Sequence, residues 1–437
     1  MAFIPIYIFI LGFTILIDYF AGIYIEKSEG KKRKLILIIS LIANISVLAI
    51  FKYYNFINHN LSLLLHGIDI TNPIPFLSIL LPIGLSFHTF QAMSYTIEVY
   101  RGKQKAEKHF GIYSLYVMFY PQLVAGPIER PQNLLHQFYE KHEFNYTRVV
   151  NGLKLILWGL FKKLVIADRL ALYVNTVYNE PTNHTGTSLI LATFFFTFQI
   201  YCDFSGYSDI AIGTAEVMGF KLMTNFNRPY FAKTISEFWK RWHISLSTWF
   251  KDYLYISIGG NKVSVPRCYL NIFIVFLVSG IWHGANWTFM AWGAINGFYL
   301  IFALIINKFE NNIRKKTILL KFPKLYVISQ ILITFLLSCF AWLFFRANTL
   351  SDAFYIIKKM ATLHGPLYFD SPSMLFFCFT GISFLLFVEA KKEFYRGNFS
   401  FTKHKNWIVR NLSYAILIIL ILLIGVFDGG QFIYFQF

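Results

Sequence analysis

The chain has 437 residues, 56% of them hydrophobic and only 14% charged, and a formal net charge of +18. A mean hydropathy of +0.51 excludes a soluble globular protein and predicts an all-α polytopic membrane protein. Nucleic-acid binding, which the positive charge suggests, is excluded because no basic stretch is long enough to form a soluble domain. The four cysteines are scattered without a C-x-x-C pair, so we expect no metal site.

Apolar stretches of spanning length predict a single membrane domain over residues 1–437. The predicted spans lie at residues 3–25, 35–56, 76–99, 188–210, 266–283, 286–306, 325–345, 373–389 and 412–426. The loop at 26–34 and the segment 101–108 are rich in Lys and Arg, whereas the loop at 57–75 has neither. Because basic loops stay on the inner side, this alternation predicts that both termini lie outside.

Three further segments, 112–131, 150–173 and 234–255, are predicted to be interfacial or re-entrant. The first is apolar, too short to span, and interrupted by Pro127 and Pro131. A broken backbone at membrane depth needs surrounding protein, and an ordinary surface loop is the alternative.

The segment 234–255 reads as one amphipathic helix that begins with a capping box, Thr234 and Glu237. Its apolar stripe repeats every three to four residues: Phe238, Trp242, Leu246, Trp249 and Tyr253. His243 falls on the opposite, polar face, where a solvated surface histidine is the alternative to a functional one.

His283 lies inside a long apolar region, residues 265–306. Polar groups are costly in hydrocarbon, so such a histidine is a functional candidate, with a buried histidine that bridges two helices as the alternative. On a continuous helix it shares a face with residues three and four positions away: Ser279, Asn286 and Trp287. Imidazole suits proton transfer near neutral pH, so His283 is the candidate acid or base.

Two other stretches carry polar or aromatic side chains beside apolar runs. Asp203 and Tyr207 lie at the end of the span at 188–210, directly after its apolar core, without the spacing of a calcium loop, and are expected to line a cavity. The C-terminal residues 432–437 are mostly aromatic and follow Gly429-Gly430, a natural hinge. This tail either anchors at the membrane interface or folds back into the protein.

Together these stretches resemble the membrane-bound O-acyltransferase family, in its bacterial branch that O-acetylates alginate and peptidoglycan. The resembling motifs, in chain order, are residues 123–130, 201–209, 225–230, 238–247, 279–284 and 432–437. The resemblance covers most of the chain and implies a ring of tilted transmembrane helices around a central tunnel, with interfacial and re-entrant helices.

The resemblance also implies roles for residues. His283 and His243 match the family's two histidines as catalytic residues, and Tyr434 in the tail is the expected acyl relay. Six residues would line the tunnel: Ser279, Asn286, Trp287, Asp203, Tyr207 and Trp242. The implied substrate is acetyl-CoA or an acylated carrier, with no bound cofactor.

The expected setting is a bacterial inner membrane, with a cytoplasmic acyl donor and a periplasmic SGNH-like acetyltransferase as partners. Two alternatives stay open from the residues. A transporter for a polar solute would also explain polar residues in spans, although the absence of an internal repeat weakens it. A non-catalytic scaffold for a periplasmic acyltransferase is the other.

Overall fold

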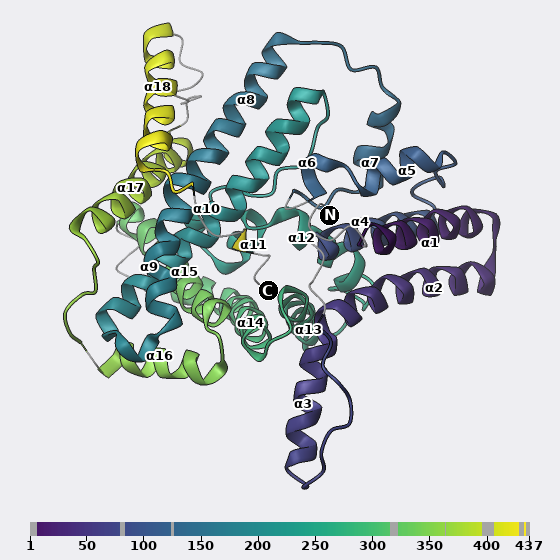
Figure 1. The fold of residues 1–437 in the computed structure, drawn as a ribbon, viewed down its shortest axis with the longest axis horizontal. Helices are drawn as coiled ribbons and strands as arrows, with labels where there is room; N and C mark the ends of the chain where they lie inside the picture. Colours follow the sequence, from purple (N-terminus) through teal and green to yellow (C-terminus); the bar gives the residue numbers. More distant parts are fainter. Residues whose placement is uncertain are drawn as a thin grey trace. The chain divides into compact units, whose positions relative to one another are not determined.

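The computed structural model describes residues 7–78, 84–123, 126–314, 322–362, 364–395, 406–427 and 432–433, with side chains of 307–314 left aside. Within these residues all regular structure is helical, and eight stretches are long and apolar enough to cross a membrane. They are α1 (Tyr7–Lys27), α2 (Gly30–Leu48) continuing into α3 (Tyr54–His66), α10 (Gly186–Met218), α13 (Val265–His283), α14 (Trp287–Arg314), α15 (Pro323–Arg346), α17 (Pro372–Phe394) and α18 (Trp407–Ile424) (Figure 1). The prediction of an all-α polytopic membrane protein is confirmed.

The prediction that a helix begins near residue 76 is wrong. Residues 71–78 have no helical structure, and the next helix, α4 (Leu85–Tyr100), begins later. Proline at 73 and 75 removes two backbone donors. The side-chain amide of Asn55 in α3 instead donates to the Leu77 carbonyl over 2.8 Å, so the chain returns alongside α3 (Figure 1).

The chain divides into two compact units, one of residues Met1–Gly152 and Ala211–Met223 and the other of Leu153–Ile210 and Thr224–Phe437. In the first unit α1, α2 and α4 pack together around buried aromatic side chains. A polar cluster ties α1 to α2, where Ser40 Oγ donates to Asp18 over 2.6 Å and Asn44 Nδ2 over 2.8 Å. The prediction of one domain over residues 1–437 stays a prediction.

The segment predicted as broken, 112–131, consists in its described residues of short helices joined by irregular chain. These are α5 (Phe110–Val117), α6 (Tyr120–Leu123), α7 (Pro131–Leu134) and η2 (Leu135–Tyr139). Glu129 is fully buried in the irregular stretch and accepts hydrogen bonds from the Met223 N–H and from Asn133 Nδ2. Protein groups therefore satisfy this buried carboxylate, and because the stretch is buried the surface-loop alternative is wrong.

The second unit holds the predicted site on closely packed helices. A Cβ atom at Gly293 of α14 would lie 2.5 Å from the Phe276 carbonyl oxygen of α13, so these two backbones touch. Residues predicted as one interfacial segment, 150–173, form the end of α8 (Tyr146–Leu160), a π-helical turn η3 (Phe161–Ala167) and the start of α9 (Asp168–Asn179). A π-helical turn displaces side chains from the regular helical register and is often found at functional sites.

Candidate active site

His283 is the last residue of α13, and this helix end corrects the predicted shared face. Gly284 is extended, so Asn286 and Trp287 leave the face that carries His283. The Asn286 amide accepts from the Thr288 N–H over 3.1 Å and donates to the Asn348 carbonyl over 2.8 Å, while Trp287 is 51% exposed. Ser279 remains buried one turn before His283.

An aromatic enclosure surrounds the His283 ring, which is only 5% exposed. Its ring centre lies 4.8 Å from Trp282, 4.9 Å from Trp292 of α14 and 5.3 Å from Phe345 of α15. Rings from three helices thus hold the imidazole and keep bulk water away. In such an environment of low dielectric constant, charge that develops on a reacting group interacts strongly with nearby dipoles.

His243 occupies a break between two helices, so the predicted continuous helix over 234–255 is wrong. The structure has α11 (Ile235–Arg241), α12 (Ile244–Trp249) and η6 (Phe250–Tyr255). His243 adopts a left-handed backbone, φ 42° and ψ 57°, which only a few non-glycine residues do. The turn buries the imidazole to 1% exposure, so the prediction of a polar, solvated face is wrong too. The apolar stripe of the segment is buried, as expected.

Hydrogen bonds set the tautomer of His243. Ser245 donates to Asn225 Oδ1 through its backbone N–H and its hydroxyl, which identifies that atom as the amide oxygen. The same oxygen lies 3.0 Å from His243 Nδ1, so Nδ1 carries the proton and Nε2 is the basic nitrogen. Burial lowers the pKa of His243 to about 3, which keeps the ring neutral near pH 7.

The two histidines lie near the same indole. The Trp282 ring centre is 4.8 Å from His283 and 6.4 Å from His243. The Trp242 ring centre lies 4.8 Å from that of Trp342, which in turn stacks on Trp292 beside His283. The structure therefore brings together His243, His283 and Trp242, which are separate in sequence. Asn225 is a neighbour that sequence reasoning missed, although it opens one of the resembling motifs.

Asp203 and Tyr207 lie elsewhere, beside the C-terminal tail. Asp203 Oδ1 is 2.7 Å from Lys163 Nζ, and its other oxygen accepts from the Ile433 N–H over 2.7 Å. The Tyr207 ring packs 4.5 Å from Phe432. Sequence reasoning missed Lys163, because alternating basic residues on an amphipathic segment resemble a solvated face. Tyr434 lies outside the described residues.

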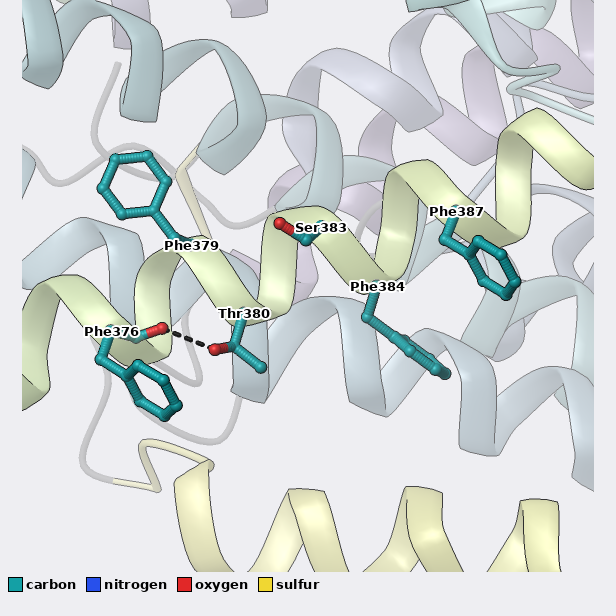
Figure 2. A pocket seen from close by; sticks show the side chains of 6 residues that line it. All are labelled: Phe376, Phe379, Thr380, Ser383, Phe384 and Phe387. Carbon is teal, nitrogen blue, oxygen red and sulfur yellow. Dashed lines mark hydrogen bonds between the residues drawn. The ribbon is translucent and has the colours of Figure 1, made fainter.

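A separate apolar groove of about 620 Å³ runs along α17. Figure 2 shows its lining side chains, four phenylalanines with Thr380 and Ser383, all on α17. The Thr380 hydroxyl donates to the Phe376 carbonyl over 2.7 Å, so the helix itself satisfies it. Because α17 is a candidate span and the groove is apolar, we assign it to lipid contact and not to the chemistry.

A model of the membrane-bound O-acyltransferase family matches residues 109–347, which contain both histidines. This chain belongs to the membrane-bound O-acyltransferase family. The predicted class of enzyme, an acyltransferase embedded in a membrane, is thereby confirmed. Among the residues that the structure describes, no group of three or more His, Cys, Asp or Glu could hold a metal ion.

Three bacterial proteins are similar to this chain over most of its length. It is 36% identical over 386 residues to the peptidoglycan O-acetyltransferase of Helicobacter pylori, covering 82% of this chain and 71% of the relative. It is 39% identical over 326 residues to the probable alginate O-acetylase AlgI of Pseudomonas aeruginosa, covering 74% and 60%. The teichoic acid D-alanyltransferase of Bacillus subtilis is 27% identical over 280 residues, covering 61% and 69%. The chain thus spans only part of the length of each relative.

Proposed function

We propose that this acyltransferase passes an acetyl group from a cytoplasmic donor across the membrane for O-acetylation of a cell-surface polysaccharide such as alginate or peptidoglycan. The observation that carries the proposal is the pair of buried histidines that both lie close to the Trp282 ring. The similar peptidoglycan O-acetyltransferase and probable alginate O-acetylase support acetyl as the transferred group. Their names also support a cell-surface polymer as the final acceptor.

His283 is the proposed general base. Its imidazole takes the proton from an acceptor hydroxyl as the oxygen attacks the thioester carbonyl of acetyl-CoA or an acylated carrier. The C–S bond breaks, and the leaving thiolate takes the proton from the His283 imidazolium, which restores the neutral base. The aromatic rings around His283 exclude water, which would otherwise hydrolyse the thioester. Ser279 stays a candidate for orienting the ring, whereas both ends of the Asn286 amide already bind backbone.

Tyr434 is the proposed first acceptor. A phenol with an ordinary pKa near 10 is easier to deprotonate than a serine hydroxyl, so an imidazole can activate it. The burial of Phe432 and Ile433, directly before it, supports a tail that folds back into the protein. The acetyl ester on Tyr434 would then be a good donor to the serine of an SGNH-like acetyltransferase on the outer side.

The proposed setting is a bacterial inner membrane with both termini outside. The basic segments at 26–34 and 101–108 would face the cytoplasm and attract the phosphates of the donor. Copurification with the outer acetyltransferase in detergent tests the partner. Acetylation of the polymer by this chain alone would contradict the need for one.

Acetyl transfer from labelled acetyl-CoA, measured with the purified enzyme in liposomes, tests the role of His283. We expect His283→Ala to lower the rate by about 10²–10⁴-fold, the usual contribution of a general base. His136→Ala, at an exposed histidine whose ring nitrogens contact the Gln132 carbonyl and the Glu140 carboxylate, is the matched control and should retain the rate.

Each rival function predicts a different result. Retained transfer in His283→Ala contradicts the catalytic role and leaves the scaffold alternative. Movement of an unmodified solute without consumption of the donor would instead support a transporter.

A further inference from the structure

The C-terminal tail is bound through its main chain to a buried carboxylate. The Ile433 N–H donates to Asp203 Oδ2 over 2.7 Å, and the side chains of Phe432 and Ile433 are buried. The two partners are 230 positions apart in the sequence. A hydrogen bond from a backbone N–H to a carboxylate is among the stronger ones in proteins. This buried hydrogen bond can therefore hold the tail in one place.

Ion pairs hold Asp203 in place. Lys163 Nζ lies 2.7 Å from both Asp203 Oδ1 and Asp168 Oδ1, and all three side chains are buried. Two buried carboxylates share this one ammonium group, so it offsets the charge of neither completely. A backbone donor that binds the second oxygen of Asp203 reduces the cost of burying that charge.

Local packing brings Lys163 to α10. Lys163 lies in the π-helical turn η3, and a Cβ atom at Gly206 would lie 3.2 Å from its backbone nitrogen. The neighbouring Lys162 has its own partners on α10, Asp209 and Ser205, each at 2.8 Å. The two lysines therefore serve separate carboxylates, and of these Asp203 accepts from the described tail residue Ile433.

Aromatic contacts connect the docked tail to the active site. The Phe432 ring centre lies 4.5 Å from Tyr207 and 5.7 Å from Phe204. Phe204 in turn lies 4.5 Å from the His243 ring. A single side chain thus separates the tail from one of the two histidines.

The chain that leads to the tail is held at the same turn. The Val426 N–H, just after α18, donates to the Leu164 carbonyl of η3 over 3.1 Å. The Arg169 guanidinium donates to the Ile424 carbonyl. On one side of 428–431 the chain therefore binds η3 and the start of α9, and on the other side it binds the carboxylate that Lys163 of η3 contacts.

We propose that Asp203, fixed by Lys163, is a positioning residue. It binds the main chain of the C-terminal tail and holds the tail beside Phe204, which contacts the His243 ring. Its importance for transfer rests on the proposed relay function of Tyr434, whereas the docking itself does not. Because the donor is a backbone N–H, this hydrogen bond does not depend on which side chain stands at position 433.

Hydrogen–deuterium exchange of the full chain in detergent, without substrate, measures the docking. We expect Asp203→Ala to speed exchange of the peptide 428–437 at least tenfold. Asp203→Asn keeps an oxygen acceptor and should restore much of the protection. Asp209→Asn, which removes the carboxylate beside Lys162, is the matched control and should leave the tail protected.

Phe432→Ala provides a second test that leaves the ion cluster intact. It removes the ring contacts with Phe204 and Tyr207 and should also speed exchange of the tail peptide. Unchanged exchange in both Asp203→Ala and Phe432→Ala would overturn the docking. Equal effects of Asp203→Asn and Asp203→Ala would instead mark Asp203 as a structural ion-pair partner and overturn the acceptor role.

Acetyl transfer separates this inference from the relay. Tyr434→Phe should keep the tail protected from exchange yet lose transfer, whereas Asp203→Ala should lose both. An active Tyr434→Phe would contradict the relay and leave the docking standing. Fast exchange in Asp203→Ala with an unchanged transfer rate would overturn the positioning role.

Discussion

Gly280 on α13 lies where two helix backbones touch, one turn before His283. A Cβ atom at this position would overlap the Phe289 carbonyl oxygen and lie 3.1 Å from its carbon and 3.3 Å from Gly293 Cα. These are backbone atoms of α14 that cannot rotate away. Gly280→Ala must therefore separate α13 from α14, by about 1 Å if normal contact distances are restored.

The separation has two measurable costs. Overpacking of this kind lowers the free energy of unfolding by about 1–3 kcal/mol. It also shifts His283 on α13 relative to Trp292 on α14, and a misplacement of about 1 Å costs on the order of 10²-fold in rate. We expect acetyl transfer in liposomes to fall by about that factor, with His283 itself unchanged.

Two glycines provide controls. A Cβ atom at Gly297, on the same helix pair, comes closest to the Phe273 ring at 3.2 Å, and at Gly12 it meets nothing within 4 Å. Gly297→Ala should have a much smaller effect because that side chain can move, and Gly12→Ala should preserve transfer, since alanine favours a helix by about 0.5–1 kcal/mol. A wild-type transfer rate in Gly280→Ala, with the protein folded, would refute the reasoning.

Three further predictions concern His243 and Glu393. His243 contacts Trp282, which separates it from the proposed base His283, so we expect it to act in binding the donor: His243→Ala should raise KM for the donor more than it lowers kcat, and an unchanged KM with a collapsed kcat would instead place it in the chemistry. Burial lowers the His243 pKa from 6.5 to about 3. Between these pH values the unfolded chain binds more protons than the folded chain, so the free energy of unfolding decreases as the pH decreases. The loss should reach about 2 kcal/mol at pH 5 and be absent in His243→Gln, measured by thermal unfolding at pH 7 and 5. Glu393 lies 2.8 Å from both Arg228 and Arg241; Glu393→Gln should lower the melting temperature through a loss of about 2 kcal/mol, whereas Glu143→Gln, at an exposed ion pair, should change it little.

Features encoded by neighbouring residues could be predicted from the sequence. Eight of the nine predicted spans coincide with helices of spanning length in the described residues, because each needs only a run of apolar residues of sufficient length, whereas the predicted span at 76–99 is not among them. The start of α11 was predicted correctly, since the Thr234 hydroxyl accepts from the Glu237 N–H over 3.1 Å. Glu237 in turn binds the Lys233 N–H, one residue before the position that a capping box implies. His283 could be singled out because an ionisable side chain inside an apolar run is costly to bury.

The surroundings of the candidate site were decided only by the tertiary structure. Helical periodicity put His243 on a polar face and Asn286 beside His283, but a left-handed residue and the end of α13 redirect those side chains. The contact of Asp203 with Ile433 joins residues 230 positions apart. Periodicity describes the faces of one continuous element. It carries no information on where a packed helix must end or which distant donor meets a buried carboxylate, because the free energy of packing and of buried polar groups decides both.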